Sequence, residues 1–460
     1  MYDSGPMRRK RTGLVGVLML LWVTPAGAAG GRILAGQQRA SSGDLNRAVE
    51  LNNQALELYK SGKVDAAIAL YKQALLINPA FEEALSNLGM ALDAKGRDDE
   101  AIGEFDAALK INPTDAVAES NRGLAFYHQK KYGEALAAYQ KAIEIHPNLP
   151  QAHNGLGATL FAEGRTEEAI AEYRKAIELQ PKYPDALNNL GAALNSQEKW
   201  EEAAGVFEQA LVLTPKATDI RVNYAHALSG AGRDDEAVAA MREVVAERPE
   251  DPVEWSTLGD LQFKQGQMDD AVESYQKSLA LDPKQPDVEF RAAAALLQAG
   301  KTPEAAEAYQ RGLALDPANA HALYNLGTAL LILKRPKEAE AQFRKAIAAQ
   351  PDFPEAEVSL SSAQAANGDY RGAEATLRGV IAKHPEDYNA QFNLGNVLYN
   401  QSRWKEAAAA YRACIQLAPD QAHAHYNLGM SLLQMNDPKT ASIEFSEAQR
   451  LDSSLKPPAR

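Results

Sequence analysis

The sequence predicts an all-α solenoid built from tandem helical hairpins, and a regular spacing of prolines is the main reason. Proline recurs eleven times at a constant interval of 34 residues, from Pro79 to Pro419. An interval of that length is typical of arrays in which no single repeat buries its apolar face alone. With proline at position 32, twelve repeats span residues 48–455, bounded as 48–81, 82–115, 116–149, 150–183, 184–217, 218–251, 252–285, 286–319, 320–353, 354–387, 388–421 and 422–455.

The repeat 82–115 shows why each repeat is expected to fold as two antiparallel helices of about 13 residues. Gly96 provides the left-handed end of the first helix, and the same position is glycine in seven repeats. Pro113 ends the second helix. Apolar and small residues recur with helical spacing on either side of the turn, at Leu85, Leu88, Gly89 and Leu92 and at Ala101, Ile102, Phe105 and Ala108.

Small residues and aromatic residues recur at positions that predict how the helices interlock. Position 20 is alanine in all twelve repeats, position 8 is glycine in eight, and position 24 is aromatic in ten. A glycine within a helix costs about 1 kcal/mol relative to alanine, so its repeated use indicates a close neighbour. We therefore expect the aromatic ring of the second helix to pack against the small residue of the first. The single cysteine, Cys414, falls at another small position and is expected to be packing.

Small residues at positions 8, 20 and 27, an aromatic residue at 24 and proline at 32 together resemble the tetratricopeptide repeat family over residues 48–455. The resemblance implies a right-handed superhelix whose first helices line a concave groove. It also implies that the groove binds peptides or partner proteins, usually without chemistry.

Asparagine occupies position 6 of the first helix in eight of the twelve repeats. Asparagine is an indifferent helix former in mid-helix, so its recurrence needs a reason. Its amide offers both a donor and an acceptor, which is what holding a peptide backbone requires. We therefore predict peptide contacts at Asn53, Asn87, Asn121, Asn189, Asn223, Asn325, Asn393 and Asn427, with Asn154 beside the interruption at Gly155.

This column is similar to the groove of the tetratricopeptide domain of protein O-linked N-acetylglucosamine transferases, although the transferase domain itself is absent. Two alternatives stay open: the asparagines bridge neighbouring repeats, or they reflect recent duplication of a repeat. Because Thr257, Arg291 and Ser359 break the column, repeats one to six and nine to twelve are expected to form separate tracks.

The eleventh repeat carries the strongest candidate surface, a full stripe of amides at helical spacing made of Asn389, Asn393, Asn396 and Asn400. Position 5 turns aromatic late in the chain, and these rings are candidates for apolar pockets beside the stripe: Tyr324, Phe392 and Tyr426. The competing interpretation is that the rings pack between first helices.

Lys264 and Arg291 lie on the inner stripe of adjacent repeats, so they are a possible anchor for one anionic group. The alternative is that Asp260 and Asp287 neutralise them.

The ends of the chain differ from the array. Residues 1–28 have a basic cluster, a short apolar run and a small-residue triplet, which predicts a secretory signal peptide. An uncleaved signal anchor is the alternative, and either Met1 or Met7 is the start. Residues 29–47 are expected to form a flexible leader, with Asp44 as the N-cap of the first helix, and residues 456–460 form a short tail. No membrane span is expected after cleavage, and a periplasmic or extracellular location, in a bacterium, follows.

Composition and spacing argue against several classes of function. The formal charge is −13 and no basic face is evident, so nucleic acid is not an expected partner. The eight histidines are scattered over six repeats, and no phosphate loop or nucleophile with a base is found. We therefore expect no metal, no cofactor and no enzyme activity, because a catalytic domain needs about 100 residues that the array does not leave.

The sequence thus predicts an exported, non-catalytic scaffold that binds proteins or extended peptides and helps to assemble an envelope complex. One alternative is an accessory subunit that presents substrates in a glycosylation or polysaccharide-export system. Another is a structural protein that self-associates through its last repeat, where no capping helix follows Leu455.

Overall fold

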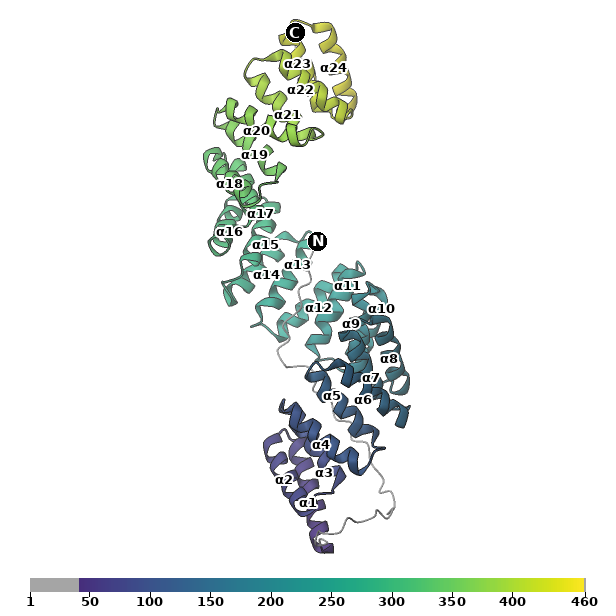
Figure 1. Ribbon diagram of the computed structural model, residues 1–460. Helices are drawn as coiled ribbons and strands as arrows, with labels where there is room; N and C mark the ends of the chain where they lie inside the picture. Colours follow the sequence, from purple (N-terminus) through teal and green to yellow (C-terminus); the bar gives the residue numbers. More distant parts are fainter. Residues whose placement is uncertain (1–40, 459–460) are drawn as a thin grey trace. The chain divides into compact units, whose positions relative to one another are not determined.

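Helices are the only regular structure between residues 41 and 458, the range that the computed structural model describes (Figure 1). The expected signal peptide and most of the expected leader lie outside this range. The helices are α1 (Ser42–Lys60), α2 (Val64–Ile77), α3 (Glu82–Ala94), α4 (Asp98–Ile111), α5 (Ala116–His128), α6 (Tyr132–Ile145), α7 (Pro150–Ala162), α8 (Thr166–Leu179), α9 (Pro184–Ser196), α10 (Trp200–Leu213), α11 (Thr218–Gly230), α12 (Asp234–Glu247), α13 (Pro252–Lys264), α14 (Met268–Leu281), α15 (Pro286–Gln298), α16 (Thr302–Leu315), α17 (Ala320–Ile332), α18 (Pro336–Ala349), α19 (Pro354–Ala366), α20 (Tyr370–Lys383), α21 (Tyr388–Asn400), α22 (Trp404–Leu417), α23 (Ala422–Gln434) and α24 (Pro438–Leu451). None of them combines the length and the apolar character that crossing a bilayer requires.

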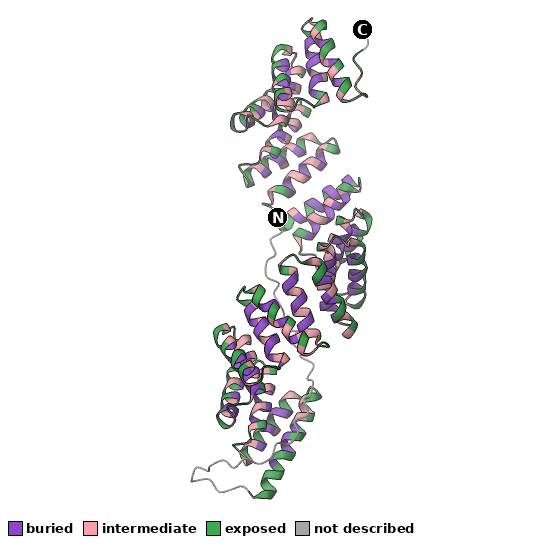
Figure 2. Ribbon diagram, turned by 90° about the vertical axis from the view of Figure 1, so that its right-hand side faces the viewer, coloured by how far each residue is buried: buried purple, intermediate pink, exposed green. Residues whose placement is uncertain are grey.

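The chain divides after Ala240, within α12, into two compact halves. Within each half, the two helices of a repeat pack together, and the second helix packs on the first helix of the next repeat. First helices of successive repeats also touch, whereas no comparable contact joins successive second helices in the described part of either half. The first helices therefore approach one another more closely than the second helices do. Buried residues lie where helices meet, and exposed residues lie on the opposite sides (Figure 2).

The leader expected over residues 29–47 was extended too far, because the first helix begins at Ser42. Residues 42–47 belong to α1, and Ser41, not Asp44, is the N-cap. The Asp44 amide donates to Ser41 Oγ over 3.1 Å, and the Ser41 amide donates back to the Asp44 carboxylate over 3.0 Å. This reciprocal capping box satisfies two amides at the helix start, which is why the helix begins earlier than the apolar pattern indicates.

The expected interlocking of glycine and aromatic side chains is confirmed. A Cβ built on Gly89 would lie 2.7 Å from the Phe105 ring, and one built on Gly191 would lie 2.6 Å from the Phe207 ring. The Phe105 and Phe207 side chains are fully buried. Cys414 is buried as well, and burial raises the pKa of its thiol to about 12. In the eight repeats with glycine at position 8, the ring of the second helix therefore fills the notch that glycine leaves in the first helix.

Side chains at position 4 reach back to the carbonyl of the repeat-ending proline, an interaction that the sequence patterns did not reveal. Trp255 Nε1 donates to the Pro249 carbonyl over 2.9 Å. Equivalent hydrogen bonds to the proline carbonyl oxygen occur in three other repeats: His153 bonds to Pro147, Arg221 to Pro215 and His425 to Pro419. The proline thus ends one repeat and presents an acceptor to the next.

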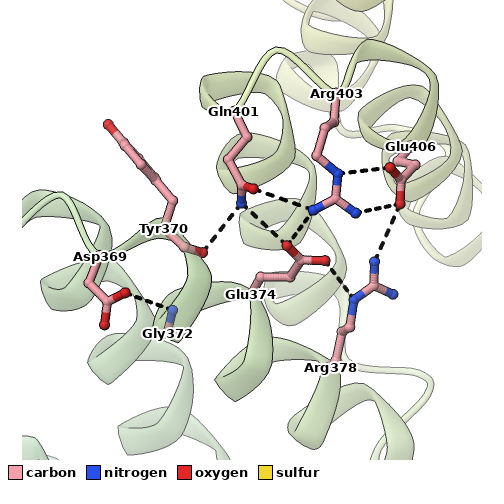
Figure 3. Close-up of polar contacts among 8 residues, drawn as sticks. All are labelled: Asp369, Tyr370, Gly372, Glu374, Arg378, Gln401, Arg403 and Glu406. Carbon is pink, nitrogen blue, oxygen red and sulfur yellow. Dashed lines mark hydrogen bonds and ion pairs between the residues drawn. The ribbon is translucent and has the colours of Figure 1, made fainter.

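A polar network joins α20 to α22 in the C-terminal half (Figure 3). The Glu374 carboxylate accepts hydrogen bonds from Arg378 over 2.9 Å and from Arg403 and Gln401 of the next repeat. Arg403 also donates two hydrogen bonds to the Glu406 carboxylate, of 2.8 Å from Nε and 2.6 Å from Nη2. Burial opposes ionisation of Glu374, but the bonds from Arg403, Arg378 and Gln401 lower its pKa below the usual range. The network stabilises the contact between these repeats.

Every turn within a repeat passes through a left-handed residue, and five of these residues are not glycine, including Glu198 with φ of 58°. We expect Glu198→Gly to raise the free energy of unfolding by about 0.5–1 kcal/mol, because a side chain strains a left-handed residue. Urea denaturation followed by circular dichroism measures the change. Gly232→Ala, at φ of 77°, is the matched control and should lower stability. A loss of stability in Glu198→Gly would contradict the expectation.

Candidate peptide-binding surface

In the N-terminal half, asparagines of the predicted column bridge neighbouring repeats. Asn87 Nδ2 donates to Asn52 Oδ1 over 3.0 Å, and Asn87 is only 8% exposed. The same link, from position 6 to position 5 of the preceding repeat, joins Asn189 to Asn154 at 3.0 Å and Asn223 to Asn188 at 3.2 Å. These asparagines therefore bridge neighbouring repeats, which is one of the two alternatives to peptide binding. Asn154 takes part in such a bridge as the acceptor.

Position 5 partners were missed in the sequence, although the signal was visible. Asn52 and Asn188 stand at the same position as Asn154, one repeat before a position 6 asparagine in each case. The pairing of two asparagine columns, offset by 35 residues, is therefore the pattern that indicates amide bridges.

In the C-terminal half, amides bond to tyrosines as well as to each other. Asn396 Oδ1 accepts from Tyr411 Oη over 2.8 Å and from Asn427 Nδ2 over 3.1 Å. Burial raises the pKa of Tyr309 to about 12, against the opposing effect of a hydrogen bond from Asn325. Asn396, Asn427 and Asn325 are therefore partly engaged within the array.

Exposure separates the remaining candidates. Asn53, Asn389 and Asn400 are exposed, whereas Asn121 and Asn393 are half-buried. An asparagine amide has two donor hydrogens and two acceptor lone pairs, so one bridge uses only part of its capacity. Asn53 of α1 and the exposed amides of α21 are therefore accessible to a ligand.

The late aromatic residues are half-buried and pack on rings of second helices. Tyr324 lies 5.9 Å from Phe343, and Tyr426 lies 5.4 Å from Phe445, measured between ring centroids. Phe392 lies 5.9 Å from Tyr411 and stacks on Tyr388. Packing is thus the dominant role of these rings, and their partners include the second helices as well as first-helix neighbours.

Of the two residues of the possible anion anchor, Lys264 and Arg291, Arg291 is engaged in contacts within the protein. The Arg291 guanidinium forms an ion pair with Asp260, and its Nε donates to the Asp287 carbonyl over 3.3 Å. Asp260 also accepts from Tyr275 Oη over 2.7 Å. Lys264 is exposed in the last turn of α13. The alternative of neutralisation by Asp260 therefore applies to Arg291.

Glu82 and Asp115, the first and last residues of the second repeat, form a carboxyl pair that sequence reasoning did not single out. Burial, followed by a hydrogen bond with Asp115 and the charges of Asp115 and Glu83, raises the pKa of Glu82 to about 7. The folded chain therefore keeps a proton on Glu82 at pH values where the unfolded chain has lost it.

We expect Glu82→Gln to become stabilising as the pH rises from about 4.5 to above 7, by about 1 kcal/mol or less for this partly exposed pair. The wild-type chain loses stability over that window because deprotonating Glu82 costs more when folded. Melting temperatures of both proteins between pH 4 and 8 measure the effect. A difference between the two proteins that stays constant over this window would rule out the assignment.

Models of one repeat family match most of the chain. A model described as TPR repeat matches residues 123–164, 157–197 and 259–300. Two models described as tetratricopeptide repeat match residues 52–116, 290–354, 359–422 and 397–455, and residues 194–259. The chain belongs to the tetratricopeptide repeat family. Among curated proteins, no relative matches it.

Several solved structures are similar to this tetratricopeptide repeat chain. One is YrrB, described as a TPR protein with an unusual peptide-binding site. It matches at 22% identity and a TM-score of 0.34, and the match covers 40% of this chain and 94% of YrrB. The Cut9–Hcn1 hetero-tetramer of APC/C matches at 14% identity and a TM-score of 0.40, with 88% and 94% covered. MamA from Desulfovibrio magneticus RS-1 matches at 22% identity and a TM-score of 0.35, with 37% and 96% covered.

Proposed function

We propose that this protein is an exported, non-catalytic scaffold that binds extended segments of partner proteins on the face of its first helices. Its membership of the tetratricopeptide repeat family supports a role in protein–protein interaction. The observation that carries the peptide-binding proposal is the amide stripe of α21, in which Asn389 and Asn400 are exposed and Asn393 is half-buried.

The dimensions of the stripe suit an extended peptide. Asn389 and Asn400 are separated by eleven helical steps, or about 16 Å along the axis. An extended chain rises about 3.3 Å per residue, so about five residues would lie along the stripe. The amides would pair with the backbone of that segment, which makes binding tolerant of its side chains.

Replacing Asn389, Asn393 and Asn400 together with alanine is expected to weaken peptide binding at least tenfold, because each lost hydrogen bond costs about 0.5–1.5 kcal/mol. Fluorescence anisotropy with a panel of unrelated labelled peptides of about ten residues measures the affinity. Gln416→Ala, at an exposed site on α22, is the matched control and should bind like the wild type. Equal affinities of the triple variant and the control would refute the assignment to this stripe.

Export is proposed from the signal-like pattern of residues 1–28. In the native host, mass spectrometry of the N-terminus after fractionation should find a chain that begins near Ala29 in the exported fraction. Crosslinking in that compartment should then capture envelope proteins. Retention of residues 1–28 on a membrane-bound chain would instead support the uncleaved anchor.

A further inference from the structure

Three potential metal ligands from different helices converge beside the turn between α3 and α4. Asp93 lies in the last turn of α3, Asp98 is the first residue of α4, and His128 is the last residue of α5. His128 Nδ1 lies 3.0 Å from Asp93 Oδ1, and one ligand atom from each residue lies within 4.8 Å of the other two. The cluster therefore joins the second repeat to the third.

Asp93 and Asp98 stand at positions 12 and 17 of the second repeat, and these positions hold aromatic residues in some other repeats. Positions 12 and 17 face each other as ring pairs at Tyr127 and Tyr132, 5.8 Å apart, and at Tyr399 and Trp404, 4.8 Å apart. In the second repeat they are two carboxylates, Asp93 and Asp98, and Asp98 is only 8% exposed. Two facing carboxylates disfavour full ionisation unless a positive charge lies between them.

Two cationic side chains next to the cluster, Arg97 and Lys95, form ion pairs with other carboxylates, and Lys131 lines the same surface hollow as Asp98. Arg97 forms bonds of 2.7 and 2.6 Å to Glu100, and Lys95 lies 3.0 Å from Asp65. A surface hollow lined by residues that include Asp98 and Gln129 opens beside the cluster.

We propose that Asp93, Asp98 and His128 bind a divalent first-row transition metal ion, of which Zn²⁺ is the probe of choice. Imidazole and carboxylate ligands suit Zn²⁺, with water completing a tetrahedral site. Ligand atoms at about 2.1 Å from Zn²⁺ lie about 3.4 Å apart, so the widest separation in the cluster, within 4.8 Å, must shorten by up to about 1.4 Å. His128 is exposed at a helix end, so its side chain can supply this movement. The bound ion would crosslink α3 and α4 to α5.

Isothermal titration of the metal-free full chain, without a histidine tag, with Zn²⁺ tests the site. One saturable site is expected, and His128→Ala or Asp98→Asn should weaken it by at least about 10–100-fold, the usual loss for an outer-shell partner alone. The matched control is His423→Ala, an exposed histidine on α23, which should leave the affinity unchanged.

Thermal unfolding provides a second readout that does not depend on the titration. Zn²⁺ should raise the melting temperature of the wild type and of His423→Ala, and a chelator should reverse the rise. In His128→Ala, whose folding is checked by circular dichroism, the rise should vanish. The proposal fails if the wild type shows no saturable binding, or if His128→Ala binds as tightly as the wild type.

Discussion

Replacing Phe207 with alanine is expected to lower the free energy of unfolding of the N-terminal half by about 3–5 kcal/mol. Phe207 lies at the aromatic position of α10, its side chain is fully buried, and its ring fills the notch at Gly191 of α9. Truncation removes buried apolar surface and leaves a cavity that glycine at position 191 cannot fill. Each repeat depends on its neighbours for burial, so the loss should spread to adjacent helices.

Hydrogen exchange measured by mass spectrometry, together with urea denaturation, can follow this loss. Protection should fall first in α9 and α10 and in the helices packed against them. Val212→Ala, at a 74% exposed side chain in the same helix, is the matched control and should change stability by less than about 0.5 kcal/mol. Similar losses in the two variants would show that the ring does not carry the packing assigned to it.

Gly191→Ala is expected to lower the free energy of unfolding by about 1–3 kcal/mol, even though alanine is the better helix former. The new Cβ would lie 2.6 Å from the buried Phe207 ring, closer than any real carbon contact allows. Gly205→Ala in α10 is the matched control, because nothing lies within 4 Å of a Cβ at that site. It should raise stability by up to about 1 kcal/mol.

A double-mutant cycle separates the clash from any local effect on α9. In a Phe207→Leu background the smaller side chain relieves the contact, so Gly191→Ala should become neutral or stabilising. Urea denaturation of the four proteins gives the coupling energy. A cost of Gly191→Ala that is unchanged in the Phe207→Leu background would contradict the proposed interlock.

Most of the fold was predictable because its determinants are local or repeat at one interval. Proline at position 32, glycine in the turn and the pairing of Gly89 with Phe105 each act within one repeat. The first helix was the exception. Ser41 and Asp44 cap it through a side-chain exchange, and polar residues that look like a leader therefore form its first turn.

The candidate site was less predictable, because a polar residue at helical spacing can face solvent or a neighbouring helix. Asn87 and Asn393 both stand at position 6 of their repeats, yet Asn87 is buried against Asn52 and Asn393 is only half-buried. The difference depends on what the preceding repeat places at position 5. That relation crosses from one repeat to another and is not a property of the helix itself.

By itself the sequence determined the helical repeat, its length and its glycine–aromatic interlock, because these follow from local backbone preference and a constant interval. Only the tertiary structure decided which amides are bridged and that Asp93, Asp98 and His128 meet. The amide bridges and the contact between His128 and Asp93 join side chains 35 residues apart on different helices, where distance depends on how one repeat is rotated against the next. Spacing along the chain does not specify that rotation.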